Sequence, residues 1–115
     1  MERKLSLKSV DEKLIDCVFN TRDTKTEHAV LFVHGLTGSP HELLYHNAIP
    51  EFLAAGYDVC RMALYSLGED RRSLEECDLS THGADISRVL KYLRPKYKTI
   101  TLVGHSLGCP SILKA

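Results

Sequence analysis

Polar and apolar residues alternate along the first part of the chain in the way that β-strands require. The alternation covers residues 4–9, and a second strand-like run covers 13–19 after the turn residues Asp11 and Glu12. These two segments therefore predict an opening β-hairpin. After a polar, turn-rich stretch, residues 29–33 are all apolar, which is typical of a parallel strand that is buried on both faces.

A helix start follows this buried run. Ser39 can cap the helix, Pro40 fits its first turn, and Glu42 completes a capping box. We expect the helix to begin at about residue 40, to kink or restart at Pro50, and to end at Gly56.

The rest of the chain repeats this alternation of strand and helix. Residues 57–62 predict a strand, and residues 62–79 predict a surface loop. A helix is expected over 80–93, because apolar residues fall at i, i+3, i+4 and i+7, namely Ile86, Val89, Leu90 and Leu93. With a last strand over 99–103, the βαβ rhythm predicts an α/β fold: a mainly parallel sheet flanked by helices, with the last strand central.

The last strand leads directly into a G-x-S-x-G motif, Gly104-His105-Ser106-Leu107-Gly108. Between a strand and a helix this motif is typical of a nucleophile elbow, which exposes a serine hydroxyl on a tight turn. Ser106 is thus the candidate nucleophile. Gly104 and Gly108 flank it because the strand and the helix pass so close to each other that larger side chains would collide. The backbone N–H of Leu107 can face the charge that develops on an attacked carbonyl. We expect the His105 ring to pack beneath the turn, and a structural Gly-Ser turn is the alternative.

A second glycine segment, His34-Gly35-Leu36-Thr37-Gly38, follows the buried run 29–33. Together with the first motif it has the place of a second oxyanion-hole loop, and the backbone N–H of Leu36 is the candidate second donor. His34 is expected to be structural rather than catalytic, because the base is expected on a later loop.

Composition and charge narrow the possible partners. Fifteen basic and fifteen acidic residues cancel, which argues against nucleic acid or anionic lipid. The charged start is followed by no apolar core of signal-peptide length, and no apolar stretch approaches the length needed to span a membrane. We therefore expect a soluble, cytoplasmic protein.

The other potential ligands show no spacing that a metal site uses. The four cysteines are far apart in the sequence and are expected to be reduced and mostly buried, so neither a metal nor a cofactor is predicted. His28 and His82 are expected at the surface or as caps, and Asp85 is expected to favour its helix N-terminus through the helix dipole.

With both motifs in place, the chain resembles the N-terminal portion of the α/β-hydrolase superfamily, in particular its lipases, carboxylesterases and serine-aminopeptidase-like enzymes. Residues 33–39 look like the corresponding loop of bacterial monoacylglycerol lipases and cinnamoyl esterases, and residues 103–108 look like their elbow. The resemblance implies that Ser106 attacks a carboxylic ester to form an acyl-enzyme. It also implies that the N–H groups of Leu36 and Leu107 form the oxyanion hole, without a cofactor.

The order of catalytic residues in such enzymes is serine, then acid, then histidine. We therefore expect residues 1–115 to be an incomplete hydrolase domain, nearly inactive alone, whose acid, histidine and lid follow Ala115. Its strand over 99–103 would present an unpaired apolar edge and favour self-association. Two alternatives remain: a non-catalytic truncated module or gene fragment, and the same fold with another reaction, such as a lyase, haloperoxidase, C–C hydrolase or peptidase.

Overall fold

Two N-terminal strands open the sheet. The computed structural model, which describes residues 1–35 and 38–115, pairs β1 (Glu2–Lys8) and β2 (Leu14–Asn20) antiparallel. The opening hairpin predicted from the alternating pattern is therefore confirmed.

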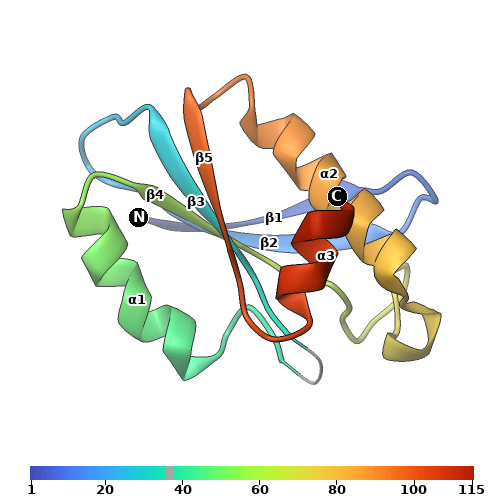
Figure 1. Cartoon of the computed structure of the whole chain (residues 1–115). Helices are drawn as coiled ribbons and strands as arrows, with labels where there is room; N and C mark the ends of the chain where they lie inside the picture. Colours follow the sequence, from blue (N-terminus) through green and yellow to red (C-terminus); the bar gives the residue numbers. More distant parts are fainter. Residues whose placement is uncertain (36–37) are drawn as a thin grey trace.

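Three further strands complete a five-stranded sheet in the order β1-β2-β4-β3-β5 (Figure 1). Strand β4 (Asp58–Met62) pairs antiparallel with β2 and parallel with β3 (His28–Val33). Strand β3 also pairs parallel with β5 (Thr99–Gly104). The mixed α/β architecture is as the sequence predicts, and β3 is the expected buried interior strand, with residues 29–33 all buried.

Strand β5 lies at the edge of this sheet, so within the described residues it is not central but has the unpaired edge that was expected for residues 1–115. Among the described residues it pairs only with β3. Thr99 and Thr101 are exposed. A strand becomes central only when another strand pairs along its second edge, and the described residues supply no such strand.

Side chains of β3 alternate between two cores, one on each face of the sheet. Val30 and Phe32 pack with helix α1 (Leu43–Ala54). Leu31 and Val33 pack on the other face with helix α2 (Leu79–Leu93), whose residues Ile86, Val89 and Leu93 are fully buried. Figure 1 shows α1 on one side of the sheet, with α2 and the short α3 (Gly108–Lys114) on the other.

Helix α1 begins later than the sequence predicts. Glu42, not Ser39, is its N-cap, and the Glu42 side chain makes no capping hydrogen bond. The Ser39 hydroxyl instead accepts a hydrogen bond from the His41 N–H at 3.1 Å, so it stabilises a turn before the helix. The helix runs without a restart through Pro50, and Gly56, with φ 101°, follows its end as expected.

The loop before α2 is partly ordered by a 3₁₀ helix, η1 (Leu74–Glu76). Helix α2 itself begins one residue earlier than the expected start at residue 80. Its N-cap is Asp78, whose carboxylate accepts a hydrogen bond from the Thr81 N–H at 2.8 Å, a contact that satisfies one of the free donors of the first turn.

Candidate functional site

The serine of the G-x-S-x-G motif lies on the tight turn between β5 and α3. β5 ends at Gly104 and α3 begins at Gly108. Ser106 has φ 53° and is exposed. A residue other than glycine rarely adopts this left-handed conformation, which costs about 1–3 kcal/mol and is held only when the surroundings determine it. The backbone therefore presents the Ser106 side chain to solvent at the C-terminal end of β5.

The turn is docked against the end of β3. The His105 N–H donates to the Val33 carbonyl at 3.1 Å. A Cβ atom on Gly108 would lie 2.2 Å from the same carbonyl oxygen, and one on Gly104 would lie 2.8 Å from the backbone nitrogen of Cys109. The strand, the turn and the helix therefore approach one another more closely than side chains at these positions would allow.

Gly35 brings the second glycine segment into contact with this turn. A Cβ atom on Gly35 would lie 2.8 Å from the His105 carbonyl oxygen and 3.0 Å from the Ser106 Cβ. The two motifs, which are about 70 residues apart in the sequence, are therefore neighbours in the fold. Leu36, the candidate second oxyanion donor, lies outside the described residues.

Leu107, directly after Ser106, has an N–H group with no hydrogen-bond partner among the described residues. Its carbonyl, by contrast, accepts from both the backbone N–H of Ser111 at 3.2 Å and the Ser111 hydroxyl at 2.8 Å. The N–H of Leu107 is therefore a free donor beside Ser106, whereas the carbonyl of Leu107 is held in place by Ser111.

His34 is buried, and both of its ring nitrogens are engaged with the backbone. Nε2 accepts from the Leu64 N–H at 2.9 Å, so the ring proton lies on Nδ1, which donates to the Gly35 carbonyl at 2.8 Å. Burial lowers the pKa of His34, although the Gly35 carbonyl opposes this shift, and the neutral ring is favoured. His34 therefore joins the end of β3 to the segment after β4, and neither nitrogen is available to accept a proton from Ser106.

Three side chains lie elsewhere than the sequence suggested. His105 is exposed rather than packed beneath the turn. His82 is buried, with 2% of its surface exposed, because α2 packs against α3. Asp85 forms a buried salt bridge with Arg72 at 3.0 Å instead of acting at the helix terminus. A signal for His82 was present, since it lies one turn before Ile86 on the apolar stripe of α2.

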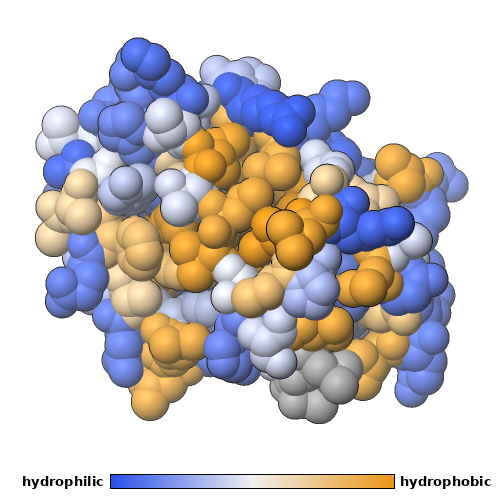
Figure 2. Space-filling view, viewed as in Figure 1, coloured by the Kyte–Doolittle hydropathy of each residue, from blue (hydrophilic) through white to orange (hydrophobic). Residues whose placement is uncertain are grey.

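A hollow of about 350 Å³ borders the serine turn. Leu107 lines it together with His82 and the apolar side chains of Leu74 and Leu79, and Cys77 and Asp78 complete the wall. On the face shown in Figure 2, apolar side chains gather over β5 and α3, where Leu113 is 87% exposed. Apolar side chains therefore form much of the surface beside the serine turn.

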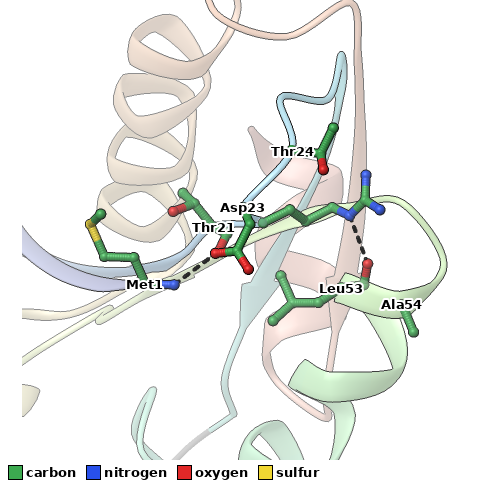
Figure 3. A pocket seen from close by; sticks show the side chains of 7 residues that line it. Met1, Thr21, Asp23, Thr24, Leu53 and Ala54 are labelled. Carbon is green, nitrogen blue, oxygen red and sulfur yellow. Dashed lines mark hydrogen bonds between the residues drawn. The ribbon is translucent and has the colours of Figure 1, made fainter.

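A second hollow, of about 410 Å³, lies away from the serine turn (Figure 3). The Met1 ammonium donates to the Thr21 carbonyl there, and the Arg22 guanidinium donates to the Leu53 carbonyl. These residues lie near the N-terminal ends of β3 and β4, whereas ligands of parallel sheets usually bind outside the C-terminal ends. This hollow is not part of the candidate site.

Within residues 1–35 and 38–115, no three His, Cys, Asp or Glu side chains gather as a metal site requires. All four cysteines are free; Cys17 and Cys60 are buried, Cys77 is half-buried and Cys109 is exposed. No helix in the described part of the chain has both the length and the apolar character needed to cross a membrane.

Comparison with known proteins finds relatives over most of the chain. A family model described as "Alpha/beta hydrolase family" matches residues 30–114. The thermostable monoacylglycerol lipase of Bacillus sp. (strain H-257) is 30% identical over 79 residues, which are 69% of this chain and 31% of the lipase. The chain thus spans about a third of the length of this curated relative.

Two esterases of known structure share the fold. Est1E from Butyrivibrio proteoclasticus, with ferulic acid bound, superposes with a TM-score of 0.83 and 18% identity over 95% of this chain and 45% of its own. An esterase from Pyrococcus furiosus superposes with a TM-score of 0.80 and 19% identity over 99% of this chain and 45% of its own.

Proposed function

Because the chain belongs to the alpha/beta hydrolase family, we propose that it supplies the nucleophile and the oxyanion hole of a serine hydrolase that acts on carboxylic esters. Ser106 is the nucleophile, and the backbone N–H groups of Leu36 and Leu107 are the oxyanion donors. The chemistry uses a side chain of the protein as the attacking group and so requires no cofactor. We place this reaction in the cytoplasm.

The observation that carries the proposal is the conformation of Ser106. Its positive φ lifts the side chain out of a strand–helix turn, and the Leu107 N–H beside it has no partner among the described residues. Gly35 approaches the Ser106 Cβ closely enough to exclude any side chain. A strained serine, a free backbone donor and a glycine segment that meet at one point are the parts of such a site that hold the nucleophile and stabilise the oxyanion, apart from the base.

In the proposed reaction the Ser106 Oγ attacks the ester carbonyl and gives up its proton to a base. The carbonyl oxygen becomes an oxyanion that accepts hydrogen bonds from the two N–H groups, and the alcohol leaves with a proton from the same base. Water then attacks the acyl-enzyme, with the base acting again. Loss of one oxyanion donor typically lowers kcat by about 10² to 10³-fold.

The base and its acid partner are proposed to come from outside the described residues. No histidine ring in the described part of the chain is hydrogen-bonded to the Ser106 hydroxyl, and both nitrogens of His34 are already engaged. We propose that residues 1–115 form the N-terminal part of the hydrolase domain and that the acid and the histidine follow Ala115 in a longer protein. The 115-residue chain alone is then nearly inactive.

A fluorophosphonate probe, which reacts with an activated serine, tests this proposal. We expect labelling of the complete gene product but not of residues 1–115, and labelling should disappear in Ser106→Ala. Ser80→Ala, at an exposed position of α2, is the matched control and should label normally. An unlabelled gene product would overturn the proposal.

The type of bond is tested with matched chromogenic substrates. The complete gene product should hydrolyse p-nitrophenyl esters with an initial burst, because the acyl-enzyme accumulates. Turnover of a peptide anilide or an epoxide without ester hydrolysis would assign a different reaction to the same fold.

A further inference from the structure

His82 connects the long helix of the fold to the serine turn. It lies in the first turns of α2 and is 2% exposed, and its Nδ1 is 3.1 Å from the hydroxyl oxygen of Ser111 on α3. Ser111 is itself fully buried. Because Ile86 and Val89 anchor α2 in the core, His82 is attached to a helix that is held against the sheet.

The hydrogen bonds from His82 end at the residue after the nucleophile. The Ser111 hydroxyl donates its single proton to the Leu107 carbonyl at 2.8 Å, so its oxygen is left to accept from His82. The ring must then carry its proton on Nδ1. Nε2 is buried without a partner in the described part of the chain. A bare lone pair at this atom costs less free energy than an unpaired N–H group would, which again favours the proton on Nδ1.

The ring is held neutral in this position. Burial lowers the pKa of His82, and the neighbouring His34 and Arg72 act in the same direction, whereas Asp78 opposes them. A neutral ring with a proton on Nδ1 donates to Ser111 continuously near pH 7, so the hydrogen-bond chain does not depend on a titration.

The backbones of α2 and α3 also touch at this point. A Cβ atom on Gly83 would lie 2.9 Å from the Lys114 Cγ and 3.0 Å from its carbonyl carbon. This close approach fixes the distance between the helices, and His82 lies beside it in α2. Helix α2 therefore positions α3, and with it Leu107, in two ways: through the close contact at Gly83 and through the hydrogen bonds from His82 to Ser111 and on to Leu107.

We propose that His82 is a positioning residue for the reaction of Ser106: through the Ser111 hydroxyl it fixes the Leu107 carbonyl and so restricts the backbone of Leu107, the residue whose N–H is the oxyanion donor. This inference rests on the proposed function. Among the described residues the hydrogen bond of His82 goes to Ser111 and not to Ser106, and His82 acts by restricting the orientation of Leu107. Misplacement of a donor weakens its hydrogen bond to the transition state more than it weakens ground-state binding.

The test compares three variants of the complete gene product. In His82→Asn the amide nitrogen takes the place of Nδ1 and can still donate to Ser111. In His82→Leu the volume is roughly kept but the donor is lost, and Ile86→Val weakens the packing of α2 while keeping the hydrogen bonds. We expect the rate of fluorophosphonate labelling of Ser106 to fall about tenfold in His82→Leu. His82→Asn and Ile86→Val should label at close to the original rate.

A spectroscopic measurement separates positioning from simple loss of stability. The ¹⁵N shifts of the His82 ring should show a proton on Nδ1 at neutral pH, and this signature should change in Ser111→Ala. A proton on Nε2 alone, or equal labelling rates for His82→Leu and the original protein, would overturn the positioning role. If the original protein is not labelled at all, the proposed function fails as well, a result distinct from equal rates.

Discussion

Gly108→Ala tests most directly how the serine turn is held in place. The added Cβ would lie 2.2 Å from the Val33 carbonyl oxygen and 3.0 Å from the His34 carbonyl oxygen. Both neighbours are backbone atoms at the end of β3, so neither can rotate away. Ordinary contact between such atoms needs about 3.5 Å, and relief therefore requires α3 to move by about 1 Å.

We expect two consequences of this movement. Overpacking of this kind lowers the free energy of unfolding by about 1–3 kcal/mol, and the backbone neighbours place Gly108→Ala at the upper end of that range. A displacement of about 1 Å at a catalytic group can lower the rate about 10²-fold. Urea unfolding followed by circular dichroism measures the first effect, and fluorophosphonate labelling of the complete gene product measures the second.

Gly56→Ala is the matched control. Gly56 has φ 101°, but a Cβ there would meet nothing within 4 Å. The substitution should therefore cost about 1–2 kcal/mol of backbone strain and leave the labelling rate unchanged, because Gly56 lies at the far end of α1. If Gly108→Ala were as stable and as reactive as the original protein, the close docking of α3 on β3 would be refuted.

Three other substitutions test a buried ion pair, the stability in acid and the exposed edge strand. Arg72→Met leaves the Asp85 carboxylate, whose side chain is 3% exposed, without its partner, and should lower the free energy of unfolding by about 3–5 kcal/mol; no loss in urea unfolding would contradict this. The Arg72 hydrogen bond holds the pKa of Asp11 well below the usual 3.8, so its stabilisation is present above pH 3.8 and is lost as the pH falls. Asp11→Asn should thus flatten the acid side of the stability profile, and an unchanged slope would contradict the assignment. Thr101→Lys, on the exposed edge strand β5, should raise the monomer fraction of residues 1–115 in size-exclusion chromatography; an unchanged elution profile would argue against association through β5.

Local periodicity was sufficient to predict the elements that carry a continuous apolar pattern. The run over 29–33 became the buried strand β3, since five adjacent apolar residues can be buried on both faces of a sheet. The stripe on α2 was equally clear, because Ile86, Val89 and Leu93 share one helix face.

The hydrophobic pattern did not predict the positions of the polar residues of helix α2. His82 was expected at the surface or as a cap and Asp85 was expected to act on the helix N-terminus, yet both are buried. Each is buried because a group distant in the sequence meets it: Ser111 accepts from His82, and Arg72 pairs with Asp85. Such partners come from tertiary packing, so no local pattern contains them. The start of α1 was misplaced for a different reason, since Ser39 bonded to the nearby His41 N–H and competed with the helix cap.

The left-handed backbone conformation of Ser106 depends on contacts with β3 more than on the sequence of the motif that contains the serine. Strand β5 is exposed at the edge, and α3 has only seven residues, so neither can by itself hold a residue in a left-handed conformation. β3 is instead buried on both faces, and its last residue, Val33, accepts the His105 N–H while its carbonyl excludes a side chain at Gly108. The strain at Ser106 is therefore sustained by a strand that is buried on both faces, and perturbations of the packing around β3 should alter the serine turn even when they leave its sequence intact.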